Sequence, residues 1–289
     1  MKKSIYKSPE ARETLMRLYD KKLASLPVVC ESRYIDTLAG STHVLIAGRE
    51  DAPPLVLLHG INAGAPLALE AISGLADTHR IYAIDSIGQT TRSAETRLPL
   101  ADNSLGKWLT DVLNGLHLAK ASVIGVSYGA FLANKLVAFS PDRVQKLIYV
   151  VPGGLVNGAF GPSIKQLTLP LLRFLFTKKD EDLKRFINTF YSDIKEDDLM
   201  FQRTCLLGVN MDYRRPPLLQ AADTAAFQGD VYCLTVDDDV FFPGGPATNR
   251  CRQLFRNFKE GYVLQNSKHM PSASRYAEIE SVIKGWLMR

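Results

Sequence analysis

The segment Gly125-Val126-Ser127-Tyr128-Gly129 decides the fold that this sequence predicts. It follows a short apolar run at 122–124 and opens a helix-length segment at 129–139, so we expect a strand to turn directly into a helix at Ser127. Glycines two residues before and after the serine remove side chains that would collide in such a tight turn. The serine then lies at a helix N-terminus, where free backbone N–H groups favour negative charge. The segment therefore predicts a serine held in a strained turn and suited to nucleophilic attack.

Apolar runs on both sides of this segment predict a parallel sheet. From residue 55 onward, short apolar runs alternate with helix-length segments, which is typical of a parallel sheet covered on both faces. The runs lie at 55–58, 81–84, 122–124, 147–151, 231–236 and 262–264, and two further β segments precede them at 28–35 and 42–47. Helices are expected at 66–76, 103–118, 129–139, 246–256 and 274–288. The predicted fold class is therefore α/β.

Residues 152–229 interrupt this alternation. They contain no convincing strand, and an unstructured loop of that length is implausible. Helical patterns occur instead at 163–176, 180–192, 195–208 and 218–227. We therefore predict a helical cap at 152–229 inserted into a core formed by 28–151 and 230–289. An N-terminal helical extension at 1–27, with its helix at 9–24, precedes the core.

Composition narrows the function classes. The chain has 289 residues and a net charge of +5, and its basic residues are scattered, so nothing indicates a nucleic-acid-binding face. No apolar run approaches the ~18 residues of a membrane span, and no secretory signal is apparent. The four cysteines lie far apart, which predicts neither a metal site nor a disulfide framework and favours a cytoplasmic protein. The expected partner is a small-molecule substrate, bound by a monomer or homodimer.

Several motifs together resemble the α/β-hydrolase fold family, in particular its lidded, carboxylesterase-like serine hydrolases. The likeness runs from about residue 28 to the C-terminus and implies a mostly parallel, eight-stranded sheet. That family orders its catalytic residues as nucleophile, acid and histidine, and this sequence offers Ser127, Asp239 and His269 in that order. Asp239 is selected from three adjacent aspartates because the family places its acid four residues before a proline, here Pro243. His269 follows the last predicted strand, where the family supplies its base.

The same resemblance implies an oxyanion hole. His59-Gly60 follows the strand at 55–58 as in the family's oxyanion loop, so the backbone N–H groups of Ile61 and Tyr128 are expected to bind the anion. Residues 85–93 resemble the family's Asp-x-x-Gly-x-Gly-x-Ser turn, except that Thr90 replaces the second glycine and puts the conformation of that turn in question. His59 is expected to organise the loop. The remaining histidines, His43, His79 and His117, are expected at the surface.

The resemblance also implies the chemistry: a serine hydrolase that cleaves an ester, or a related acyl bond, of a small and largely apolar substrate through an acyl-enzyme. Such a reaction needs no cofactor and no metal. Four apolar side chains are expected to contact the substrate: Leu171, Phe174, Phe241 and Met270. Four alternatives use the same fold and triad, namely a carbon–carbon bond hydrolase, a lactonase, a cofactor-free haloperoxidase-like enzyme and a ligand-sensing regulator without turnover.

Overall fold

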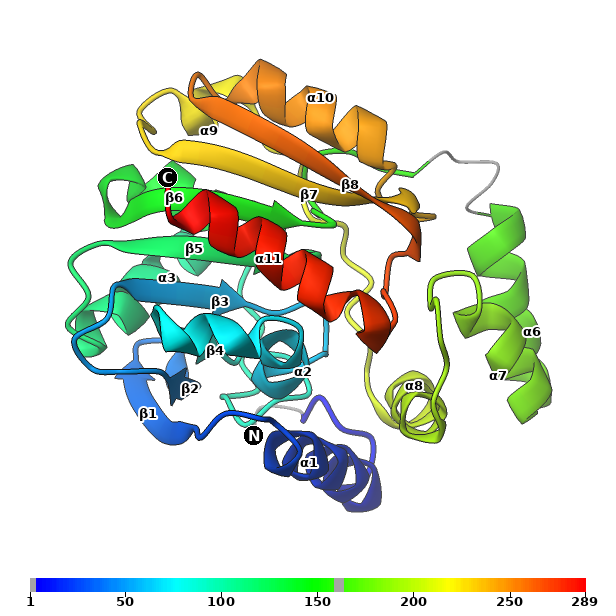
Figure 1. Ribbon diagram of the computed structural model, residues 1–289. Coiled ribbons are helices and arrows are strands. Elements are labelled where there is room, and N and C mark those ends of the chain that lie inside the picture. Colours follow the sequence, from blue (N-terminus) through cyan, green and yellow to red (C-terminus); the bar gives the residue numbers. More distant parts are fainter. Residues whose placement is uncertain (1–3, 159–163) are drawn as a thin grey trace.

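One eight-stranded sheet forms the centre of the computed structural model, which describes residues 4–158 and 164–289 (Figure 1). The strands lie in the order β1-β2-β4-β3-β5-β6-β7-β8. Strand β2 pairs antiparallel with β1 and β4, and every other neighbouring pair is parallel. The predicted α/β class with a mostly parallel sheet is therefore confirmed.

Each predicted β segment overlaps a strand, although the segment 28–35 begins three residues before β1 and the segment 147–151 ends one residue after β6. The strands are β1 (Glu31–Thr37), β2 (Gly40–Ala47), β3 (Pro54–Leu58), β4 (Arg80–Ile84), β5 (Ala121–Val126), β6 (Val144–Val150), β7 (Asp230–Asp238) and β8 (Phe258–Lys268). The central strands β3 and β5 are buried along almost their whole length, because helices cover both faces of the sheet. Strand β8 is an edge strand with many exposed residues, and its apolar run marks only part of its length.

Helices cover both faces and enclose two apolar cores. On one face lie α2 (Ala65–Glu70), the short 3₁₀ helix η1 (Ser73–Asp77) and α11 (Tyr276–Leu287), whose buried side chains share one core with the sheet. On the other face lie α3 (Ser104–Gly115), α4 (Tyr128–Phe139) and α10 (Gly244–Leu254). Figure 1 shows α11 and α2 in front of the sheet and α3 behind it. Two short 3₁₀ turns, η2 (Pro141–Arg143) and η4 (Ala273–Arg275), complete the core.

The segment between β6 and β7 is helical. It contains a π-helical turn, η3 (Ile164–Thr168), followed by α6 (Leu169–Thr177), α7 (Asp180–Ile187), α8 (Glu196–Gly208) and α9 (Ala221–Thr224). Helices α6 and α7 project beyond the sheet, and together with α8 they surround a separate apolar cluster, whereas α9 lies against α4 of the core (Figure 1). Residue 163, where the first of the expected cap helices begins, lies outside the described residues.

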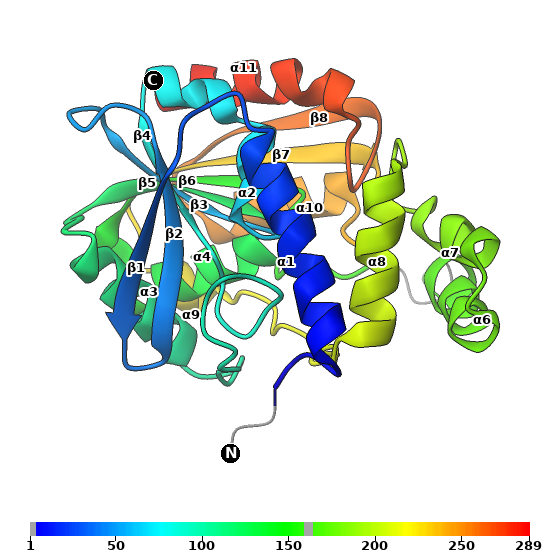
Figure 2. The ribbon, with the colours of Figure 1, turned by 90° about the horizontal axis from the view of Figure 1, so that it is seen from below.

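The first helix, α1 (Pro9–Ala24), begins where the Ser8 side chain accepts a hydrogen bond from the backbone N–H of Ala11. It lies alongside α8 and packs on α2 (Figure 2). Just before α1, Tyr6 forms an antiparallel bridge with Val209, directly after α8. The N-terminal segment therefore contacts both the helical segment between β6 and β7 and the helices that cover the sheet. Within the described ranges, no helix is long and apolar enough to cross a membrane.

Candidate active site

Ser127 lies in the turn between β5 and α4, and its backbone is strained, with φ 52° and ψ −114°. Both flanking glycines are required by the packing. A Cβ atom at Gly129 would lie 2.0 Å from the carbonyl oxygen of Leu58, and one at Gly125 would lie 2.6 Å from the Cα atom of Ala130. The predicted strand-to-helix turn is present, and it presents the serine beyond the carboxyl end of the sheet.

The three predicted catalytic side chains lie in one hydrogen-bonded line. His269 Nε2 is 3.0 Å from Ser127 Oγ, and His269 Nδ1 is 2.8 Å from Asp239 Oδ2. Both His269 and Asp239 are buried. Because an ionised carboxylate can only accept, Nδ1 carries the proton and the neutral ring offers the Nε2 lone pair to the serine hydroxyl. This is the tautomer that a general base needs.

The loop after β7 fixes the orientation of Asp239. Its Oδ1 atom accepts the backbone N–H groups of Phe241 and Phe242 at 2.9 and 3.0 Å, which leaves Oδ2 facing His269. Both phenyl rings also contact the imidazole edge-on, with ring centroids 4.9 and 5.7 Å from that of His269. Both rings therefore restrict the movement of the imidazole.

The neighbouring aspartates have different surroundings. The carboxylate of Asp237 accepts the backbone N–H groups of Asn266 and Ser267 at 2.8 and 2.9 Å, close to the end of β8 that carries His269. The bond from Ser267 lowers the pKa of Asp237. Asp238 is exposed, and among the described residues its side chain accepts no hydrogen bond, while its backbone pairs with Lys268 in the sheet. Spacing in the sequence distinguished Asp239 from both, but it did not indicate that Asp237 holds the histidine loop.

The two residues whose backbone amides were predicted to form an oxyanion hole are Ile61 and Tyr128. Tyr128 is the first residue of α4, and within the described chain neither its N–H nor that of Ile61 donates to another residue. The next amide in the loop, that of Asn62, is occupied because it donates to Gln89 Oε1 at 2.6 Å. The Thr90 hydroxyl donates to the carbonyl oxygen of Asn62 at 2.9 Å, so the residue that replaces the usual glycine ties the two loops together.

His59 is buried at the base of this loop. Its Nε2 atom accepts the backbone N–H of Ser86 at 2.9 Å, so the ring proton must lie on Nδ1, which donates to the carbonyl oxygen of Gly60 at 2.6 Å. Burial lowers the pKa of His59, in agreement with a neutral ring. The expectation that His59 organises the oxyanion loop agrees with these contacts.

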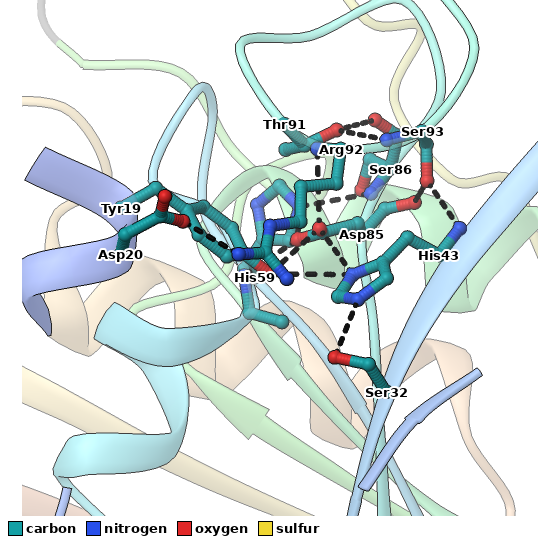
Figure 3. A network of polar contacts seen from close by, with 11 residues as sticks. Tyr19, Asp20, Ser32, His43, His59, Asp85, Ser86, Thr91, Arg92 and Ser93 are labelled. Atoms are coloured by element: carbon teal, nitrogen blue, oxygen red, sulfur yellow. Dashed lines mark hydrogen bonds and ion pairs between the residues drawn. The ribbon is translucent and has the colours of Figure 1, made fainter. Parts of the chain in front are cut away.

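A buried carboxylate, Asp85, lies beside His59 and connects four segments (Figure 3). It accepts hydrogen bonds from the hydroxyl of Tyr19 in α1, from His43 Nδ1 in β2 and from the backbone N–H of Ala65, at 2.8 to 2.9 Å. Burial alone would raise the pKa of Asp85, but the hydrogen bond from His43 and the nearby imidazoles outweigh it and lower that pKa. The carboxylate therefore remains ionised and fixes the end of the oxyanion loop at Ala65.

The expectation that His43 and His79 lie at the surface is wrong. His43 has no exposed surface, because its ring is enclosed between Asp85 and Ser32, and His79 is also buried. His117 is exposed, as expected. A single histidine within a predicted strand gives no sequence signal of burial. Only the pairing of β2 with β4 brings His43 to the carboxylate that it needs.

The predicted substrate contacts divide into two groups. Phe241 and Met270 are half-buried, and both lie beside His269, one in ring contact and the other as its chain neighbour. Phe174 has no exposed surface and forms part of the apolar cluster inside the cap with the half-buried Leu171. The prediction that Phe174 contacts substrate is therefore wrong, because the cap helices use its ring for their own core.

Two cavities are lined by loops and helices around the candidate site, and neither is lined by Ser127, Asp239 or His269. The smaller, of about 50 Å³, is lined by both predicted oxyanion residues and by polar side chains that include Gln89 and Arg97. The larger, of about 340 Å³, lies between α1, α2 and α8. Among residues 4–158 and 164–289, no three His, Cys, Asp or Glu side chains gather as a metal site requires.

The chain is similar to known hydrolases in sequence. The family model described as alpha/beta hydrolase fold matches residues 53–199. Two Bacillus subtilis proteins, uncharacterized carboxylesterase nap and carboxylesterase YbfK, are 35% and 30% identical over 134 residues. That region is 46% of this chain and 45% of each relative, so the match spans about half the length of both.

Solved structures agree with the fold. The crystal structure of naproxen esterase from Bacillus subtilis superposes with a TM-score of 0.82 over 97% of this chain and 99% of that chain, at 21% identity. Carboxylesterase CesB (YbfK) from the same organism gives a TM-score of 0.80 over 96% and 98%, at 19% identity. With the family match over residues 53–199, the topology of the sheet and the strained turn at Ser127, the chain belongs to the α/β hydrolase fold family.

Proposed function

We propose that this protein is a serine hydrolase that cleaves esters, with Ser127 as nucleophile, His269 as general base and Asp239 as the residue that orients the histidine. The observation that carries the proposal is the hydrogen-bonded line from Ser127 Oγ through both ring nitrogens of His269 to a buried carboxylate. The two curated relatives described as carboxylesterases support an ester as the substrate.

The geometry supports a two-step mechanism. As Ser127 Oγ attacks the carbonyl carbon, His269 Nε2 takes its proton, and the carbonyl oxygen becomes an anion that the N–H groups of Ile61 and Tyr128 bind. The imidazolium is stabilised by Asp239 and gives the proton to the departing alcohol, which leaves an acyl group on the serine. A water molecule, deprotonated by the same nitrogen, then attacks the acyl carbon, and the acid is released as Ser127 recovers its proton. Nucleophile, base and oxyanion donors are all groups of this chain, so these steps need no cofactor.

Covalent labelling tests the proposal. A fluorophosphonate should modify Ser127 stoichiometrically, and peptide mass spectrometry should locate the adduct. The Ser127→Ala variant should lose both labelling and turnover of nitrophenyl acetate, whereas Ser274→Ala, which changes an exposed serine outside the site, should keep both. Full labelling of Ser127→Ala would contradict the assignment of the nucleophile.

The kinetics of the same assay distinguish an enzyme from a ligand sensor. An esterase releases many equivalents of nitrophenol per protein molecule, whereas a sensor with a stable acyl-serine stops after one. Lactones and vinylogous diketones, offered in parallel, test the other reactions that this triad supports. Turnover of either one with no turnover of any ester would replace the ester assignment.

A further inference from the structure

The 340 Å³ cavity between α1, α2 and α8 has no role in the reaction derived above. Its volume falls within the ~300–1,000 Å³ typical of small-molecule sites. Its walls are mainly apolar and include Leu15, Leu18, Pro66, Leu67, Tyr191 and Phe201. We propose that this cavity binds an uncharged, apolar group of the substrate, so that α1 is part of the substrate site. The inference rests on the proposed esterase function and names its substrate class.

The inner end of the cavity lies close to the reacting centre. Ala63, which lines it, donates its backbone N–H to Gly60 at 3.1 Å, and a Cβ atom at Gly60 would lie 3.5 Å from that of Ser127. Tyr191, on the opposite side, pairs with Met270, the neighbour of His269. The cavity therefore ends against the oxyanion loop on one side and the histidine loop on the other, so a substrate bound at Ser127 can extend one of its groups into it.

The charges around the cavity favour an uncharged group. Three lysines and three carboxylates line it: Lys21, Lys22, Lys195, Glu70, Asp197 and Asp198. Lys21 pairs with Asp197 at 2.7 Å, and Lys22 pairs with Glu70 at 2.9 Å. Asp198 accepts the backbone N–H of Lys195. Because the six charges sum to zero and four of them form ion pairs, the lining as a whole favours neither a carboxylate nor an ammonium group on the ligand.

The wall that α1 provides is fixed in place at both of its sides. Tyr19 lines the cavity and donates its hydroxyl to the buried Asp85 on the core side (Figure 3). On the cap side, Tyr6 bridges to Val209, and α1 lies along α8 (Figure 2). The cavity is therefore part of the folded protein and not a loose gap between two segments.

Filling the cavity tests the proposal. Leu18→Trp and Leu67→Trp add bulk from two different helices, and Leu172→Trp adds the same ring to an exposed face of the cap as a matched control. Two pairs of substrates identify which end of the ester enters the cavity: nitrophenyl octanoate against nitrophenyl acetate for the acyl group, and octyl acetate against ethyl acetate for the alcohol. In both cavity variants, the kcat/KM ratio of long to short substrate should fall at least about tenfold for one pair. The control should keep both ratios within about twofold.

A binding measurement separates this inference from the proposed function. In the Ser127→Ala background, octanol should give a ligand-observed NMR signal that Leu18→Trp and Leu67→Trp abolish, and the octanoate anion should bind at least about tenfold more weakly than octanol. If the wild-type protein hydrolyses no ester but these binding results hold, the cavity assignment stands and the esterase assignment fails. The inference is overturned if the folded variants change neither substrate ratio by more than about twofold, or if octanol binds Leu18→Trp and Leu67→Trp as well as their Ser127→Ala parent.

Discussion

Replacing Asp239 with asparagine should reverse the direction of the hydrogen bonds through the triad. The backbone N–H groups of Phe241 and Phe242 require an acceptor at the Oδ1 position, so the amide oxygen of the new side chain occupies it. The amide nitrogen then faces His269 Nδ1 and donates to it, which moves the ring proton to Nε2. A protonated Nε2 cannot accept the proton of Ser127, 3.0 Å away. Since the same reversal in a serine protease costs ~10⁴-fold in kcat, we expect a comparable loss, equivalent to ~5 kcal/mol of transition-state stabilisation.

Steady-state hydrolysis of nitrophenyl acetate measures this loss. Asp238→Asn is the matched control, because the Asp238 side chain is exposed and the pairing of this residue with Lys268 is through the backbone. The control should remain within a few-fold of the wild-type protein. Equal circular dichroism spectra and melting temperatures for both variants would exclude unfolding as the cause. An Asp239→Asn enzyme within about tenfold of wild type would refute the reasoning, since the histidine would then be oriented by another group.

Three further substitutions follow from the same structure. Asp237→Asn should lower kcat/KM about fivefold, equivalent to ~1 kcal/mol, because it weakens the hydrogen bonds from Asn266 and Ser267 that hold the loop before His269. A loss no larger than that of Asp238→Asn would contradict this. Tyr19→Phe should lower the free energy of unfolding in urea by ~1–3 kcal/mol, because it removes a hydrogen-bond donor from the buried Asp85. An unchanged midpoint of urea unfolding would show that the bond between Tyr19 and Asp85 contributes nothing to stability. Phe174→Ala should lower the free energy of unfolding by ~3–5 kcal/mol and leave the preference for the chain length of the ester unchanged. A changed preference in a stably folded variant would show that Phe174 contacts the substrate.

The sequence predicted those parts of the fold that depend on local pattern. The alternation of apolar runs and helical segments located the strands from β3 onward. It did so most fully for the central strands, such as β3 and β5, because a strand buried on both faces must be apolar along its length. The glycines around Ser127 predicted the turn for a steric reason that the contacts of Gly129 bear out. The spacing of Asp239 from Pro243 depended on the family resemblance, and the structure places that carboxylate beside His269.

The features that the sequence did not predict depend on contacts between distant segments. Nothing near His43 indicates a carboxylate, because Asp85 reaches it only through the pairing of two strands. Phe174 is indistinguishable in the sequence from a cap residue that faces substrate, since both are apolar positions of one amphipathic helix. The sequence also gave no indication of the cavity beside α1, because the residues that line it come from three helices and from loops that are distant in the sequence.

The bridge between Tyr6 and Val209 has a consequence for the order of folding. Contacts between these two segments, such as that of Lys7 Nζ with the carbonyl oxygen of Leu207, join residues 200 positions apart. Closing so long a loop is entropically costly, and during synthesis α1 leaves the ribosome well before its partner helix exists. Helix α1 therefore makes its contacts with α8 only after α8 has been made. A nascent chain can thus form the turn at Ser127 before α1 and α8 are in contact, because β5 and α4 both precede α8 in the sequence.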